Sequence, residues 1–266
     1  MKKYLSLIRY ELKTIVKDAF NVFILLYPVM MLFICGYLIP QILKITSSPD
    51  SNAQAITLLI SFLLLIAVGG YMMGIMLGFM LLDNRDENTL VNIAVSPITI
   101  SGYATFKIIY TYVLAVASNI LMVGGVKLVA SDAYAITYMG MSISLFESIS
   151  YGEIIWFSGV SGLIVPFIAL IFAAFAKNKI EGFAFAKMGG FIVMIPLLVL
   201  LNSFQDYKQY ILGLFPSFWP MKALLNEAIG VVGDWDLSFT LYLLIGSVYP
   251  LILGFFALKL FIKKLK

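Results

Sequence analysis

Six long apolar segments, separated by short polar stretches, dominate the pattern along the chain. A helix crosses the hydrocarbon of a bilayer with about 20 residues, each adding about 1.5 Å of rise. The pattern therefore predicts an all-α integral membrane protein with six transmembrane helices in a single domain over 1–266. The expected spans are 20–39, 56–82, 108–130, 154–176, 183–201 and 237–258.

The first 18 residues differ from these spans because apolar and basic residues alternate along them. Charges occur too early and too often for the apolar core of a cleavable signal peptide. The apolar positions recur at helical spacing, which favours a helix with one apolar face and one basic face. The pattern predicts an amphipathic helix over 1–18 that lies in the membrane interface.

Composition fits a membrane protein with little soluble mass. The 266 residues are 62% hydrophobic and 12% charged, with a mean hydropathy of +1.00, whereas soluble domains carry about 25% charged residues. The net charge of +4 is interpreted as basic cytoplasmic loops and not as a nucleic-acid-binding surface.

The positions of the Lys and Arg residues predict the orientation. With the N-terminus inside, fourteen of the 18 basic residues fall on the cytoplasmic side. The four on the outer side are Lys44, Lys127, Lys208 and Lys222. Cytoplasmic loops carry an excess of Lys and Arg, so we expect both termini to face the cytoplasm of a multi-pass protein.

The longest outer segment, 202–236, contains an aromatic turn bracketed by Pro216 and Pro220. The stretch after Pro220 has the pattern of a short helix. Either it lies in the outer interface, or it re-enters the membrane, where its backbone must be buried in protein or line a wet cavity.

The sequence contains few groups that do chemistry. It has no histidine, which removes the commonest general base and metal ligand. No GxxxxGK[ST] phosphate-binding loop is present. The central parts of the spans carry no charge, and Lys187, near the start of the fifth, can extend to the interface. We expect a protein that is not an enzyme and binds no cofactor or metal itself.

Three glycines in the second span, Gly70, Gly74 and Gly78, recur every four residues and share one helix face. Such a stripe lets another helix approach closely. Packing between spans of the same chain is one interpretation. A dimer interface and a wall facing the substrate are the others.

The polar stretch LLDNRDENTLVNIAVSPITISGYATFK, residues 81–107, stands out from its surroundings. It opens with an acidic cluster and continues with a short amphipathic run. Ser96-Pro97 then breaks the run, because proline lacks an N–H and disfavours helix at the residue before it. A polar loop with its own helix between two spans is a candidate docking surface, although a merely solvated loop has the same composition.

This loop, the interfacial helix and the six spans resemble the ABC type-2 permease family. Members have acidic residues, a Thr-Leu pair, a Ser-Pro and a Lys at the start of the third span. Asn88 and Asn92 depart from the residues common in members. The segment KNKIEG, residues 177–182, is similar to one found in bacterial drug-export members.

The resemblance implies an exporter subunit of the bacterial plasma membrane that moves an amphipathic drug, antimicrobial peptide or lipid-like substrate. A cytoplasmic ATP-binding subunit would hold ATP and Mg, and a second permease subunit would complete a homodimer or heterodimer within the membrane lipid. The alternatives are an ion-coupled secondary carrier and a non-transporting scaffold. The residues implied for coupling lie in loop 83–107 and just after the fourth span: Asp83, Asp86, Glu87, Thr89, Leu90, Ser96, Pro97, Lys179 and Glu181.

Overall fold

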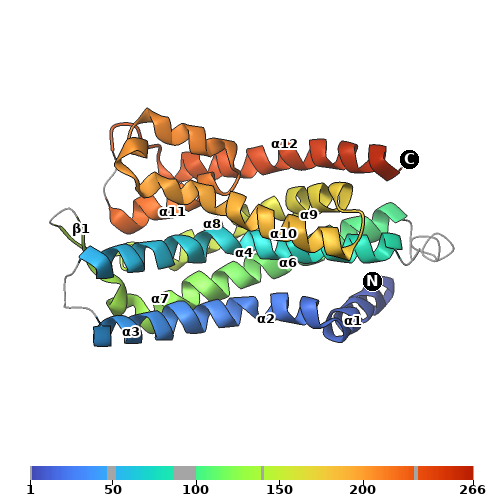
Figure 1. Cartoon of the computed structure of the whole chain (residues 1–266), viewed down its shortest axis with the longest axis horizontal. Coiled ribbons are helices and arrows are strands. Elements are labelled where there is room, and N and C mark those ends of the chain that lie inside the picture. The colour runs from blue at the N-terminus through green and yellow to red at the C-terminus, as the bar shows by residue number, and fades with distance from the viewer. Residues whose placement is uncertain (1, 47–51, 87–99, 139–140, 231–232, 266) are drawn as a thin grey trace.

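The computed structural model describes residues 2–46, 52–86, 100–138, 141–230 and 233–265. It is a bundle of long, roughly parallel and antiparallel helices (Figure 1). The first half of the chain contains α1 (Lys2–Lys17), α2 (Ala19–Phe33), η1 (Ile34–Leu38), α3 (Ile39–Thr46), α4 (Asn52–Asp86), α6 (Ile100–Asn119), η2 (Ile120–Gly124), α7 (Gly125–Ala130) and η3 (Ser131–Tyr134). The second half contains β1 (Ala135–Tyr138), β2 (Met141–Ser144), α8 (Tyr151–Gly162), α9 (Ile164–Phe175), α10 (Lys179–Met194), η4 (Ile195–Leu200), η5 (Asn202–Phe204), η6 (Tyr207–Leu214), α11 (Phe218–Ile229) and α12 (Phe239–Leu265).

Six helical segments are long and apolar enough to cross a membrane, which confirms the predicted fold class. They are Ala19–Thr46, Asn52–Asn84, Thr105–Tyr134, Tyr151–Phe175, Lys179–Leu200 and Phe239–Lys264. Most extend beyond the predicted bounds, because polar residues at helix ends continue the backbone hydrogen bonding that apolar length alone does not reveal. In particular, α4 continues to Asp86 and α6 begins at Ile100, so both ends of the expected loop 83–107 are helical.

The all-α fold class holds, and one short hairpin is its exception among the described residues. β1 and β2 pair as an antiparallel hairpin with Ala135 opposite Ser144 and Tyr138 opposite Met141. The following Phe146 is fully buried and packs edge-on against the rings of Phe62 and Tyr134. Short runs in which alternate residues face a core favour strand over helix, and this hairpin closes one end of the bundle.

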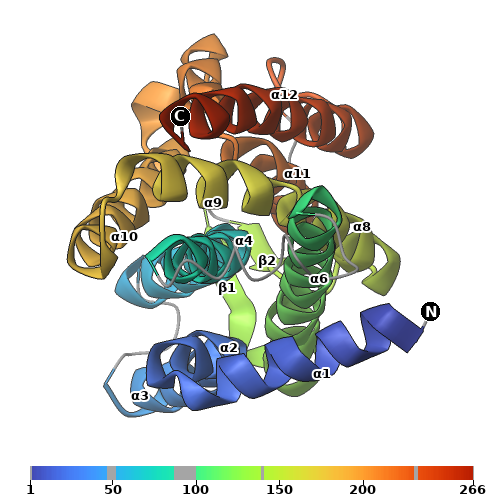
Figure 2. The same cartoon turned by 90° about the vertical axis from the view of Figure 1, so that its right-hand side faces the viewer.

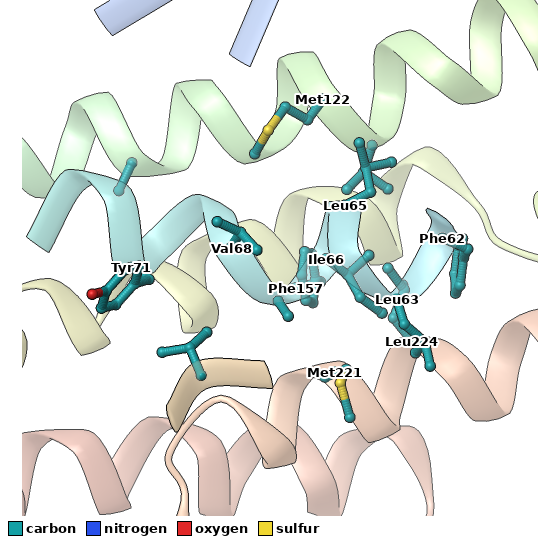
Figure 3. Close-up of a cluster of buried hydrophobic side chains, with 14 of the residues drawn as sticks. Phe62, Leu63, Leu65, Ile66, Val68, Tyr71, Met122, Phe157, Met221 and Leu224 are labelled. Atoms are coloured by element: carbon teal, nitrogen blue, oxygen red, sulfur yellow. The ribbon is translucent and has the colours of Figure 1, made fainter. Parts of the chain in front are cut away.

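The core is built around α4, which Figure 2 shows in the centre of the bundle with α2, α6, α9 and α10 around it. The apolar window of this helix is 83% buried, whereas those of the first and fifth spans are only 17% buried. Figure 3 shows its side chains meeting Met122 of η2, Phe157 of α8 and two residues of α11, Met221 and Leu224. An apolar helix without a polar face is buried on all sides, and α4 takes that place.

The glycine stripe of α4 faces α8 and α9 of the same chain. A Cβ added at Gly70 would lie 2.6 Å from the carbonyl oxygen of Ser161, and one at Gly74 would lie 2.8 Å from Ile168 Cβ. A Cβ at Gly78 would lie 2.6 Å from the ring of Phe172. These separations are shorter than van der Waals contact, so the helix axes approach as closely as they do only because the side chains are absent.

Pro220 lies in the first turn of the helix α11, which is packed inside the bundle end against α12, α8 and α4. Its cation Lys222 is 8% exposed and lies 2.9 Å from Asp236 Oδ1. Burial alone would raise the pKa of Asp236, but the hydrogen bonds and charge of Lys222 and the N–H of Gly233 outweigh it and hold that pKa below its usual range. The pair lets Lys222 be buried with its charge compensated.

Candidate functional site: a polar junction at one end of the bundle

Four helices meet at the end of the bundle opposite the β-hairpin (right in Figure 1). They are α1, which lies across this end in Figure 2, the last turn of α4, the first turns of α6 and the start of α10. The ends of α4 and α6 that flank residues 87–99 are here, as is the C-terminal end of α12. The polar residues of this region form what we call the polar junction: Glu11, Asp18, Asp83, Asn84, Tyr103, Lys107 and Lys179.

A buried ion pair forms the inner part of the junction. Glu11 of α1 is 1% exposed and Lys107 of α6 is 3% exposed, and Lys107 Nζ lies 3.6 Å from Glu11 Oε1. Removing two charges from water costs several kcal/mol per ion, about as much as their attraction returns. Such a pair is weak evidence for added stability, but it fixes which groups of α1 and α6 must face each other.

Two neutral side chains complete the inner part. The Tyr103 hydroxyl donates to Glu11 Oε1 at 2.8 Å, and the amide nitrogen of Asn84 donates to the Tyr103 oxygen at 3.4 Å. The Lys107 ammonium also lies 5.0 Å from the centroid of the Tyr103 ring. Among the residues that the structure describes, Glu11 Oε2 has no hydrogen-bond partner. The network therefore links α1, α4 and α6 while leaving one carboxylate oxygen unused.

A second, more exposed group links α10 to the same end. Lys179 Nζ lies 3.0 Å from Asp83 Oδ1 and 3.7 Å from Asp18 Oδ2, and its side chain is 50% exposed. Asp18 is also the N-cap of α2, since its Oδ1 accepts the N–H of Phe20 at 2.8 Å. Lys179, the first residue of α10, thus connects α10 to the end of α4 and to the corner between α1 and α2. Solvent screens this contact, so it contributes at most about 1 kcal/mol.

The start of α10 is fixed by local hydrogen bonds. Asn178 accepts the N–H of Glu181 through Oδ1 at 3.0 Å, and Glu181 Oε2 accepts the N–H of Lys177 at 2.9 Å. Side-chain caps of this kind satisfy donors that a helix N-terminus leaves open. Glu181 therefore has a structural role in positioning Lys179.

The comparison with known families agrees with a membrane protein of six apolar spans. Residues 11–258 match the Rv2686c-like family, described as "Fluoroquinolones export permease protein Rv2686c-like". The chain belongs to this family. It is therefore an ABC-2 type export permease, as the resemblance of the loop implied. No curated protein and no solved structure matches the chain.

The structure brings two of the expected coupling residues together in the permease, namely Asp83 and Lys179. Asp86 is the last residue of α4, and Glu181 caps α10. Glu87, Thr89, Leu90, Ser96 and Pro97 lie outside the described residues. The glycines Gly70, Gly74 and Gly78 lie along α4 against α8 and α9, away from the junction.

Sequence reasoning missed the inner part of the junction. It included Lys179 among the coupling residues but gave no role to Glu11, which pairs with Lys107. A signal was present in α1, where Glu11 stands four residues before the buried Ile15 and so shares its face. A carboxylate on the apolar side of a basic helix indicates a buried cation nearby.

Proposed function

We propose that the permease exports an amphipathic substrate with energy from a separate cytoplasmic ATP-binding subunit, which docks at the end of the bundle that carries the polar junction. The observation that carries this proposal is the buried ion pair Glu11–Lys107, which lies just inside the helix ends that flank residues 87–99.

The junction suits the transmission of a displacement. Docking on residues 87–99 would move the ends of α4 and α6, and the junction ties these ends to α1 and α10 through Tyr103, Lys107 and Lys179. Buried charged groups do not slide freely past apolar ones, because an unpaired buried charge is costly. The four helices would therefore move together, and the apolar spans would follow.

Cargo and partners follow from the family and from the composition of the spans. The matched family is described by fluoroquinolone export, and an apolar bundle without charges in its centre suits cargo of this amphipathic type. ATP and Mg would be held by the partner subunit. A second permease subunit, identical or related, would complete the pathway, with both termini of each subunit in the cytoplasm of a bacterial cell.

The test is a charge reversal in the expected docking loop. In Glu87→Lys, the permease should be expressed and folded normally, while cargo-stimulated ATPase activity of the reconstituted complex falls and the ATP-binding subunit is lost from pull-down. Leaving a desolvated interfacial charge without its partner costs about 2–5 kcal/mol. Pro97→Ala, which relaxes the break in the loop, should show a milder form of the same defect.

The matched control is Lys263→Glu, a charge reversal at an exposed position of α12 at the same end of the bundle. It should leave both assays unchanged. Wild-type values for Glu87→Lys in both assays would mean that the loop is solvated and that the docking surface lies elsewhere. Transport that persists without the ATPase but stops when the proton or sodium gradient is collapsed would identify a secondary carrier instead.

A further inference from the structure

A cavity of about 350 Å³ interrupts the packing between α4, α9 and α10. The turn before α11 closes one side of it through Phe215, Pro216 and Ser217. Sites for small molecules in proteins have volumes of roughly 300–1,000 Å³. The cavity lies on the opposite side of α4 from α6, and none of its lining residues belongs to the polar junction.

The walls of this cavity are apolar and rich in aromatic rings. Six rings line it, those of Tyr71, Phe167, Phe172, Phe175, Phe185 and Phe215. The hydroxyl of Tyr71 donates to the carbonyl of Ala186, so that polar atom is already satisfied. Aromatic rings favour stacked or edge-to-face contact with other rings beyond the burial of their area. A flexible acyl chain gains no such contact, so the walls favour a flat aromatic ligand over a lipid tail.

Helix α10 forms one wall of the cavity. The order of small and large residues along α10 sets its distance from the neighbouring helices. At Gly189 its backbone lies close to Tyr71, because an added Cβ would be 2.6 Å from the Tyr71 hydroxyl oxygen. On either side, Phe185, Met188 and Ile192 project toward the space and keep the helices apart. One close contact flanked by large side chains leaves a cavity that persists when no ligand is bound.

One end of the cavity lies at a polar boundary of the bundle, because it reaches Phe175, the last residue of α9, whose ring centroid lies 4.1 Å from Lys264 Nζ. Phe175 is 42% exposed at this end, whereas the exposed Met188 lies within the membrane-spanning segment Lys179–Leu200, where the surroundings are hydrocarbon. Burying an unpaired charge among these walls would be costly, since they offer no partner for it. A ligand with an apolar ring system and charged ends is accommodated with only the rings inside.

We propose that this cavity binds the aromatic ring system of the exported substrate, with the charged groups of that substrate at the end near Phe175. This inference rests on the proposed function and narrows its cargo to molecules with a planar ring system. It also gives α10 a second role, because the helix that walls the cavity begins at Lys179, the residue that contacts Asp83 in the polar junction.

The test measures binding of norfloxacin, a fluorescent fluoroquinolone, by anisotropy to the whole purified permease in lipid nanodiscs without nucleotide or the ATP-binding subunit. Met188→Trp adds a large ring at the cavity and should weaken binding by about tenfold or more, because overfilling a packed space displaces other groups. Phe185→Leu keeps an apolar wall but removes one ring, and should weaken binding about threefold.

Each variant has a matched control on α10. Met194→Trp and Phe191→Leu make the same changes at partly exposed positions that do not line the cavity, and both should bind norfloxacin as the wild type does. Failure of norfloxacin to bind the wild type, or equal affinities in lining and control variants, overturns the proposal. The proposal is also overturned if a fluorescent fatty acid binds more weakly to the lining variants than to the controls and norfloxacin does not compete with it. That result would assign the cavity to acyl chains.

The two proposals fail in different ways. ATP-dependent norfloxacin uptake into inverted vesicles is measured for the same variants with the ATP-binding subunit present. Transport by the wild type that is equally strong in Met188→Trp and Met194→Trp would remove the cavity from the substrate path and leave the exporter intact. Binding that follows the expected pattern without any ATP-dependent uptake would remove the proposed energy source and leave the cavity as a binding site.

Discussion

At the scale of single residues, Glu11 and Lys107 are the positions where charge is least expected. Both are almost completely buried at the end of an apolar bundle, and they come from helices that are far apart in the chain. Replacing a buried ion pair by apolar groups is often neutral, whereas removing one partner is costly. The pair is therefore best understood as a device that positions α1 against α6.

We predict that Lys107→Met destabilises the permease by about 3 kcal/mol, because it leaves Glu11 buried with an unpaired charge. Glu11→Leu should destabilise it by a similar amount for the reciprocal reason. The double variant should recover most of the loss. The measurement is thermal unfolding in detergent for all four proteins, read as a double-mutant cycle.

The outcome that contradicts this prediction is additivity. If the double variant loses as much stability as the two single variants together, the two charges do not interact in the folded permease. A control pair at exposed positions, Lys13→Met and Lys17→Met, should leave the unfolding temperature nearly unchanged, because surface substitutions usually change stability by less than about 0.5 kcal/mol.

At the scale of elements, α4 is the helix that the others pack against. Its glycine stripe contacts α8 and α9, its apolar side chains meet η2, α8 and α11, and its end contributes Asp83 and Asn84 to the polar junction. Helices in a membrane associate through close packing rather than through the hydrophobic effect. The small residues of α4 therefore matter as much as its large ones.

We predict that Gly74→Leu lowers the stability of the permease by about 2 kcal/mol, because a large side chain must displace Ile168. Thermal stability and particle size in detergent are the measurements. Gly152→Leu serves as the control, since Gly152 is exposed near the start of α8 and an added Cβ meets only Ser150 Oγ, at 3.7 Å. An unchanged unfolding temperature for Gly74→Leu would show that α4 and α9 do not pack as the structure has them.

At the scale of the whole molecule, the two ends of the bundle differ in kind. One end carries α1, the junction and the C-terminal end of α12, and the other carries the β-hairpin, α3 and α11 (Figure 1). The basic residues follow the same division, since Lys44, Lys127, Lys208 and Lys222 all belong to segments at or near the hairpin end. The expected orientation, with the α1 end in the cytoplasm, rests on this division, because cytoplasmic loops carry an excess of Lys and Arg.

We predict that single cysteines at Ser48, Tyr207 and Asp234 are labelled from outside intact cells by a membrane-impermeant thiol reagent. Cysteines at Asn88 and Asn178 should be labelled only after permeabilisation. The native Cys35 is 2% exposed, so it should contribute little background. Labelling of Asn88→Cys in intact cells would reverse the orientation and remove the proposed docking surface from the cytoplasm.

The sequence by itself determined the six membrane-length helices. A long apolar segment must satisfy its own backbone hydrogen bonds in a bilayer, and this requirement needs no knowledge of its neighbours. The spacing of Gly70, Gly74 and Gly78 was visible for the same reason, because it is a local pattern. The hairpin was not, since four-residue strands leave too short a pattern to distinguish from a loop.

Only the tertiary structure decided which of these residues meet. Glu11 contacts Tyr103, 92 residues away, and no local pattern carries that pairing, because it depends on the angle at which α1 crosses the bundle end. The aromatic cavity is likewise assembled from α4, α9, α10 and the turn at Phe215, each of which reads as ordinary membrane helix or loop alone. Contacts between distant segments depend on how whole helices pack, and packing is a property of the fold and not of any single stretch of sequence.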